Sequence, residues 1–203
     1  MVTDKPPVPF SKDLKSWLQS DQPKTLADLT DVFGERSFAV VILLLMFLPA
    51  LPLPTGGVTH IFELITMLLA LELVVGRRTI WLPRSLKHRE LGKLTQQKAI
   101  PLIIRRVEWF EKISRPRFAN FLNHHLFVRV VGLVILAFTV AAFLAPPFSG
   151  LDTLPSMAVI ALALALILGD TVIFIIGCLL GIGGIAVEVA LGKAVFSLFH
   201  HFF

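Results

Sequence analysis

Four ionisable side chains lie inside long apolar runs, where a charge is costly and usually has a function. The four are His60, Glu63, Glu72 and Glu188. His60 and Glu63 are three residues apart and share one face of a helix, so they could relay protons or bind a polar headgroup. Alternatively, both lie near the membrane surface, close to the turn sequence PTGG at 54–57.

Glu72 is expected to have a structural partner. It lies four residues before Gly76, within reach of the basic segment that follows. We expect an ion pair with Arg77 or Arg78.

Glu63 and Glu72 are nine residues apart and project from opposite sides of a helix, so they do not form the paired carboxylates of a hydrolase pocket. The chain is therefore not expected to be an enzyme.

Glu188 belongs to a stripe of small residues. The stripe consists, in chain order, of Gly177, Gly181, Gly184, Glu188 and Gly192. These residues are 4, 3, 4 and 4 positions apart, so they fall on one helical face. Small residues let membrane helices approach closely, so Gly177, Gly181 and Gly184 predict a packing face. We expect Glu188 to face another helix with a polar partner or water. It could instead lie at the interface near Lys193, or take part in proton coupling.

No motif for a metal or cofactor is present. His124-His125 and His200-His201 are adjacent pairs, whereas a helical metal site needs ligands on one face. Cys178 is the single cysteine and cannot build a metal site alone. No cofactor is expected.

Composition identifies the class of protein that must position these groups. The 203 residues are 55% hydrophobic and only 16% charged, against about 25% charged in soluble domains. Residues 77–126 contain 12 basic and 3 acidic side chains, a local charge of +9 in a chain of net charge +5. These values exclude a soluble globular or disordered chain. A basic loop between apolar regions is typical of a membrane protein rather than of a nucleic-acid binder.

The apolar runs predict an all-α polytopic membrane protein with about five transmembrane helices. The first run, 37–53, contains Pro49 and Pro52 and is at the short limit for a span, so it either spans or is re-entrant. We favour spanning, because a re-entrant segment would put the basic loop on the wrong side. The expected regions are an amphipathic cytoplasmic arm (1–36), a first hairpin (37–76), a basic cytoplasmic connector (77–126), a second hairpin (127–169) and a C-terminal helix with its tail (170–203).

The two hairpins show a possible internal repeat at an offset of 93 residues. Residues 36–76 and 129–169 are identical at 12 of 41 positions. The informative pairs are Arg36 with Arg129, Pro54 with Pro147, Gly57 with Gly150, and Gly76 with Gly169. Repeats with broken helices recur in transporters. The alternative is that short membrane hairpins look alike without a duplication.

Two polar segments predict amphipathic helices. In the N-terminal arm, Ser11 and Thr25 could cap short helices, the second ending at Gly34. In the connector, residues 100–113 have one apolar face, with Arg105 and Arg106 elsewhere. Either segment could lie on the membrane, where the connector would meet anionic headgroups, or dock on the protein's own helices.

Four stretches together resemble the ExoD family, the bacterial exopolysaccharide synthesis D proteins. They are LADLTDVFGERSF (26–38), FLPALPLPTGG (47–57), LALELVVGRRTIWLP (69–83) and RPR (115–117). The most specific part is G-R-R-x-x-W-L-P, here Gly76 to Pro83. The family's usual glutamine at L-A-L-Q appears as Glu72. The resemblance implies a bacterial inner-membrane protein linked to exopolysaccharide production, with no known reaction.

Three functions are compatible with these features. The first is a transporter or flippase for a polar lipid or glycolipid intermediate. The second is a non-catalytic accessory or scaffold of an exopolysaccharide synthesis or export complex. A membrane enzyme acting on lipid-linked sugar is least favoured. Under any of these functions, the expected protein partner is a second copy of the chain or the exopolysaccharide machinery. We expect a multi-pass protein of the inner membrane with a cytoplasmic N-terminus and membrane lipids as partners.

Overall fold

The computed structural model describes residues 9–21, 24–51, 57–77, 79–81, 90–93, 95–113, 125–146 and 149–202. Within these residues the secondary structure is helical, and no strand is present. The elements are α1 (Phe10–Gln19), α2 (Leu26–Phe33), α3 (Glu35–Met46), α4 (Val58–Val75), a π-helical segment η1 (Thr95–Ala99), α6 (Ile100–Ile113), α8 (His125–Leu144), α9 (Thr153–Leu168) and α10 (Thr171–Phe202). The all-helical class expected from the sequence is confirmed.

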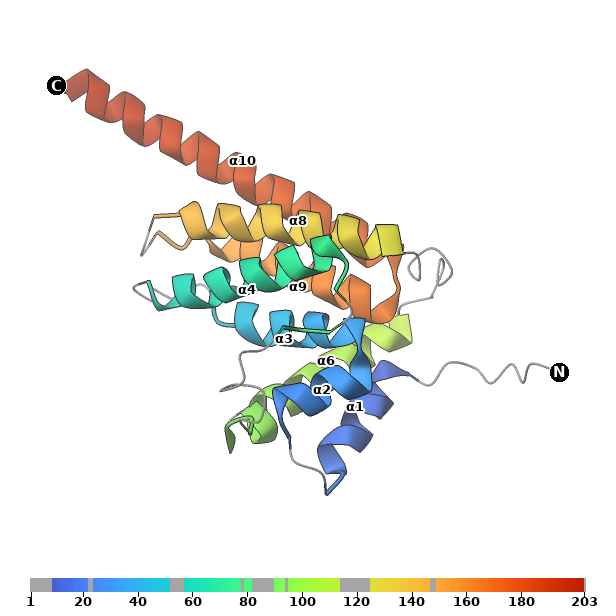
Figure 1. Ribbon diagram of the computed structural model, residues 1–203. Helices are drawn as coiled ribbons and strands as arrows, with labels where there is room; N and C mark the ends of the chain where they lie inside the picture. Colours follow the sequence, from blue (N-terminus) through green and yellow to red (C-terminus); the bar gives the residue numbers. More distant parts are fainter. Residues whose placement is uncertain are drawn as a thin grey trace.

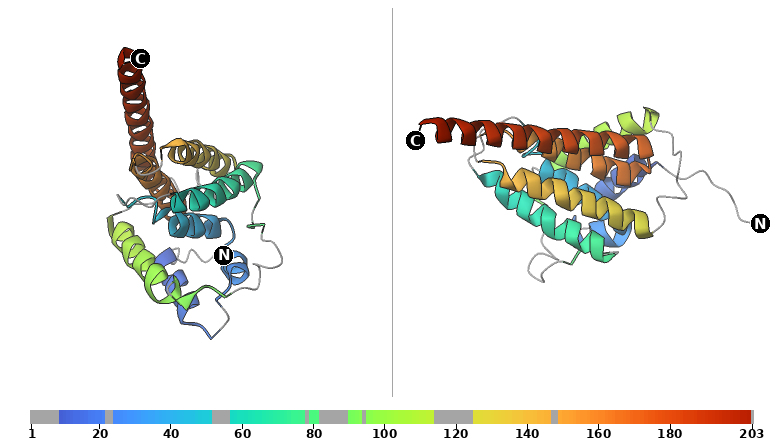
Figure 2. Two further views of the ribbon diagram at one scale, coloured as in Figure 1. Left: turned by 90° about the vertical axis from the view of Figure 1, so that its left-hand side faces the viewer. Right: turned by 90° about the horizontal axis from the view of Figure 1, so that it is seen from above.

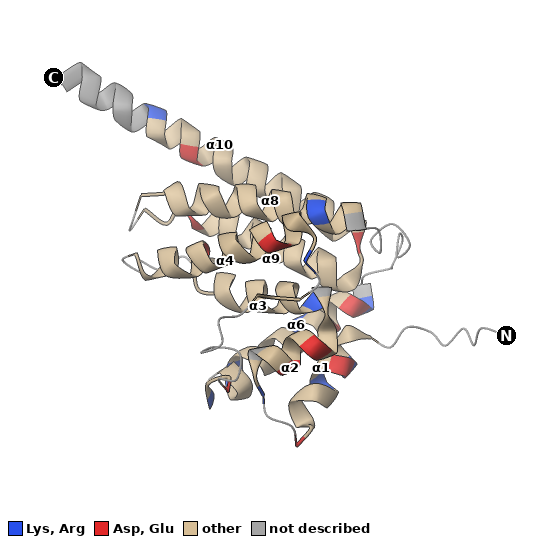
Figure 3. Cartoon of the chain, viewed as in Figure 1, with Lys and Arg blue, Asp and Glu red and all other residues tan. Residues whose placement is uncertain are grey.

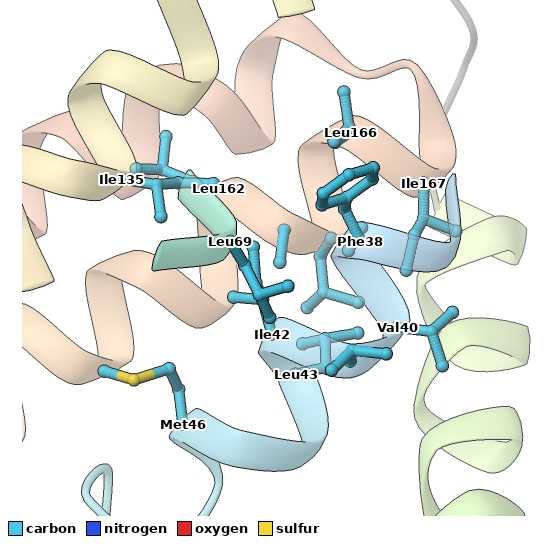
Figure 4. Close-up of a cluster of buried hydrophobic side chains, with 14 of the residues drawn as sticks. Phe38, Val40, Ile42, Leu43, Met46, Leu69, Ile135, Leu162, Leu166 and Ile167 are labelled. Carbon is cyan, nitrogen blue, oxygen red and sulfur yellow. The ribbon is translucent and has the colours of Figure 1, made fainter. Parts of the chain in front are cut away.

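Four helices form the central bundle. Helix α3 packs against α4 and α9, and α8 packs against the same two helices (Figures 1 and 2). Helix α10 covers α9 and, less extensively, α8. The apolar core lies where these helices meet: Phe38 and Ile42 of α3 are fully buried with Ile135 of α8 and Leu162 of α9 (Figure 4).

Among the described residues, three helices are long and apolar enough to cross a membrane, so the expected count of about five spans is not confirmed. They are Val58–Val75, Leu126–Leu144 and Thr171–Lys193. Helices α3 and α9 have 12 and 16 residues, whereas a span needs about 17–25. Gly34, at φ +54°, separates α3 from α2, and Pro49 lacks the N–H that would continue α3 beyond Met46. Both short helices are largely buried by their neighbours.

Helices α1, α2 and α6 form a separate layer on the side of α3 that faces away from α8 (Figure 1). Helix α2 begins with a capping box in which Thr25 and Asp28 bind each other's backbone N–H, and it ends at Gly34 as expected. Ile100, Ile104 and Val107 of α6 are buried in the protein core. The inner face of α6 therefore docks on the protein rather than on lipid.

Apolar side chains cover the opposite side of the molecule. Exposed residues with large apolar side chains run along α4, α8 and α10, among them Ile61, Leu68, Leu133 and Leu179. Charged residues instead gather on the layer of α1, α2 and α6 and at helix ends (Figure 3). Many exposed apolar side chains along long apolar helices are typical of contact with lipid.

The two hairpins are arranged as a parallel repeat would require. Gly57 and Gly150 lie at one end of the bundle, and Gly76 and Gly169 at the other (Figure 1). Gly76 and Gly169 both end their helices in the left-handed conformation, at φ +85° and +67°. The duplication itself stays a prediction. Pro52, Pro54 and Pro147, which we expected to mark the turns, lie outside the described residues.

Candidate functional site

Glu63 of α4 is a fully buried carboxylic acid. Its exposed fraction is 0%, and neither carboxylate oxygen accepts a hydrogen bond from the part of the chain that the structure describes. The imidazole of His60 lies one turn earlier, with 3.4 Å between His60 Nδ1 and Glu63 Oε2. The i, i+3 spacing thus brings the two side chains together in the fold.

Asp152 approaches the same place from a different element. It immediately precedes α9 and interacts electrostatically with both Glu63 and His60. Burial raises the pKa of Asp152 above its ordinary value of 3.8, while His60 and a hydrogen bond from the Thr59 side chain act in the opposite direction. Asp152 therefore holds its proton more tightly than an exposed aspartate.

Glu188 brings a third carboxylate from α10. It is half-buried, its Oε1 has no hydrogen-bond partner among the described groups, and it interacts electrostatically with Asp152. One turn earlier, Gly184 packs against Pro155 of α9, and this contact brings Glu188 towards the start of α9. We call Glu63, Asp152 and Glu188, with His60, the carboxylate cluster.

The repeat offset relates the polar residues of the two hairpins. Adding 93 to Thr59 gives Asp152, and adding 93 to Glu63 gives Ser156. Ser156 is fully buried, and its hydroxyl also has no hydrogen-bond partner among the described residues. Under the predicted repeat, Asp152 and Ser156 correspond to Thr59 and Glu63. Asp152 and Ser156 were not among the expected site residues, and the predicted alignment of the two hairpins was the signal that could have indicated them.

The cluster gathers ionisable side chains from three parts of the bundle. Asp152, at the start of α9, interacts electrostatically with Glu63 of α4 and with Glu188 of α10. Among the described residues, no three His, Cys, Asp or Glu side chains are close enough together to hold a metal ion.

Glu72 lies apart from this cluster. Its Oε2 accepts a hydrogen bond of 2.7 Å from the backbone N–H of Trp81. The expected partners were Arg77, which is exposed, and Arg78, which lies outside the described residues. The observed bond ties the segment after α4 back to its last turn, so Glu72 has a structural contact with a different partner.

Three glycines of α10 lie against neighbouring helices, whereas Gly192, which we expected on the same face, has open space beside it. A Cβ atom at Gly177 would lie 3.1 Å from the side chain of Leu162, and one at Gly184 would lie 2.9 Å from Pro155, both in α9. At Gly181 the Cβ would lie 2.2 Å from the ring of Phe138 in α8. These three glycines lie where α10 approaches the bundle most closely.

The basic residues of α6 line a surface groove. Arg105, Arg106 and Lys112 surround it together with Leu102, Glu108 and Trp109, and its volume is about 480 Å³. This groove lies on the exposed side of α6, away from its buried face. It is separate from the carboxylate cluster.

Comparison with known proteins gives one family and two relatives. The family described as "Exopolysaccharide synthesis, ExoD" matches residues 10–190. An uncharacterized protein of Synechocystis is 26% identical over 178 residues, covering 88% of this chain and 80% of the relative. Protein ExoD of Rhizobium meliloti is 28% identical over 187 residues, covering 88% of this chain and 76% of the relative. No solved structure gives a significant match.

Proposed function

Because the chain belongs to the ExoD family of exopolysaccharide synthesis proteins, we propose that it is an integral membrane protein whose carboxylate cluster binds and releases protons as it acts in exopolysaccharide production. The observation that carries this proposal is Glu63, a fully buried acid without a hydrogen-bond donor among the described residues. A buried acid that served packing alone would be replaced by an apolar residue at lower cost.

The position of the cluster supports proton movement rather than a fixed structural charge. Its carboxylates come from α4, from the start of α9 and from α10, so a shift of any one of these helices changes the distances between the acids. A changed distance changes proton affinity, and this couples helix movement to proton exchange. Coupling of this kind would be of use to a transporter of a polar sugar intermediate, whereas an accessory protein has no need for it.

For the topology, we propose that the protein lies in the cell inner membrane with its N-terminus and basic connector in the cytoplasm. The charge of +9 in residues 77–126 supports this orientation. To test this orientation, Thr79 and Ser149 are each replaced by cysteine in a Cys178→Ser chain. Both residues are exposed, and they lie at opposite ends of the bundle. An impermeant thiol reagent should label Ser149→Cys in intact cells and Thr79→Cys only after lysis. The reverse pattern would overturn the orientation.

The proton hypothesis is tested by complementation. In a bacterium that lacks its own copy of this protein, Glu63→Gln should reach normal membrane levels yet lower exopolysaccharide at least tenfold, because the amide cannot exchange a proton. Glu72→Gln is the matched control: it changes the same residue type in the same helix, at a carboxylate with a backbone partner. This control should support normal production.

The opposite results are equally informative. If Glu63→Gln restores exopolysaccharide as well as the parent chain does, proton exchange at the cluster is not required, and the accessory role becomes the better account. A pH-sensitive dye inside vesicles that contain the purified protein gives a second measurement. The parent chain should admit protons faster than Glu63→Gln does.

A further inference from the structure

The exposed face of α6 combines three kinds of side chain in one groove. Arg105, Arg106 and Lys112 are exposed cations, Trp109 is a 56% exposed aromatic residue, and Glu108 is a half-buried acid. The net charge of these five side chains is +2. The buried face of the same helix is occupied by the protein core, so the groove is a separate feature with its own chemistry.

The helix that carries the groove is held in place. Glu111 accepts hydrogen bonds from the backbone N–H of Ser11, at 3.0 Å, and from the Ser11 hydroxyl. The carboxylate therefore meets the N-terminal end of α1, where the helix dipole favours negative charge. Because Glu111 is used in this contact and Ile104 and Val107 are buried, α6 presents its outer face on a rigid support.

We propose that this groove binds a glycosyl phosphate, that is, a sugar ring that carries a phosphate group. The two guanidinium groups and the ammonium group bind phosphate oxygens, for which arginine has the best geometry. The indole of Trp109 offers a broad apolar surface on which a sugar ring stacks. All the described lining residues belong to α6, so the sugar phosphate would lie along the outer face of this helix.

Glu108 distinguishes this ligand from an anionic lipid surface. A carboxylate among three cations weakens attraction to a purely anionic headgroup. It is, however, the natural acceptor for the hydroxyl groups of a sugar. The ligand class also fits the family's role in exopolysaccharide synthesis, since phosphate-linked sugars are the activated form from which such polymers are built. The inference stands whether or not the carboxylate cluster carries protons.

The molecule offers a matched control groove. On α1, a surface groove of about 430 Å³ is lined by Lys12, Lys15, Ser16, Gln19 and Ser20. It has nearly the same volume and two cations, but it lacks an aromatic ring and arginine. The proposal predicts that this second groove does not contribute to binding of a sugar phosphate.

The test uses the full chain purified in detergent and isothermal titration calorimetry. Glucose 1-phosphate should bind at least tenfold more tightly than inorganic phosphate or glucose. Arg105→Ala/Arg106→Ala should weaken glucose 1-phosphate at least tenfold. Trp109→Ala should weaken glucose 1-phosphate and leave inorganic phosphate unchanged. Lys12→Ala/Lys15→Ala should bind as the parent does, and circular dichroism should show the same helix content in every variant.

Three results would overturn the proposal. One is equal affinity for inorganic phosphate and glucose 1-phosphate, which would leave only an anion site. Another is unchanged affinity in Trp109→Ala. The third is binding to phosphatidylglycerol vesicles that depends on Arg105 and Arg106 but is not reduced by glucose 1-phosphate, which would assign the groove to lipid.

Discussion

Gly132 of α8 lies directly against α4, and this contact gives a quantitative prediction. A Cβ atom at this position would lie 2.8 Å from Leu73 Cβ, 3.1 Å from the backbone nitrogen of Val74 and 3.2 Å from the carbonyl oxygen of Ala70. Two of these three atoms belong to the backbone of α4, so no side-chain rotation relieves the overlap. Gly132→Ala must therefore push the two helices apart.

The magnitude follows from comparison with a glycine in open space. Overpacking in a filled core costs about 1–3 kcal/mol. Gly183 is the control, because a Cβ atom there meets nothing within 4 Å. Both substitutions gain about 0.5–1 kcal/mol from the lower flexibility of alanine in a helix, so this gain cancels in the difference. Gly132→Ala should be less stable than Gly183→Ala by about 1–3 kcal/mol.

The assay is thermal unfolding of the detergent-purified variants, followed by circular dichroism. At roughly 2–4 °C per kcal/mol for a chain of this size, Gly132→Ala should melt about 2–12 °C below Gly183→Ala. Equal melting temperatures would refute the reasoning, because they would mean that α4 and α8 can separate at no cost. A lower melting temperature for Gly183→Ala than for Gly132→Ala would contradict the expected order of the two variants.

Three further predictions concern other contacts. Gly181→Ala should lower stability by about 1–3 kcal/mol by displacing the ring of Phe138, and the second change Phe138→Leu should restore part of the loss, which a melting series would measure. Thr25→Ala removes the capping box of α2 and should lower the free energy of unfolding by about 1 kcal/mol, whereas an unchanged value would show that α3 alone holds α2 in place. Because burial raises the pKa of Asp152, the folded protein binds the proton more tightly than the unfolded chain does; the free energy of unfolding should fall as pH rises from 3.8 through the raised pKa. Asp152→Asn should reduce this pH dependence in melting experiments between pH 4 and 7, and an unaltered profile would assign it to another group.

Much of the fold was predictable from patterns of residues that lie close together in the sequence. The capping role of Thr25, the end of α2 at Gly34 and the amphipathic face of α6 depend on residues within a few positions of each other. The same holds for His60 and Glu63, which a single helical turn brings together. Each of these features was predictable because the chain itself supplies the geometry.

The rest of the site depends on contacts between distant helices. Asp152 follows a turn and looks like a solvated residue in the sequence, and only the packing of α9 against the bundle brings it to Glu63. The expected count of about five spans, which is not confirmed, took account of apolar residues but not of burial, and most side chains of α3 are buried by other helices. The partner of Glu72 is a backbone N–H, which no residue-type pattern reveals.

The length of α10 has a mechanical consequence for the C-terminus. Its 32 residues measure about 48 Å at 1.5 Å per residue, and even at a tilt of about 40° they extend about 37 Å along the membrane normal. The hydrocarbon core is about 30 Å thick, so the helix cannot be contained within it at any ordinary tilt. From Glu188 to Phe202 the helix continues as a rod about 21 Å long, beyond the last described interaction with the bundle (Figure 2). Any rotation of α10 about its contacts near Glu188 would therefore move Phe202 much further than it moves Glu188.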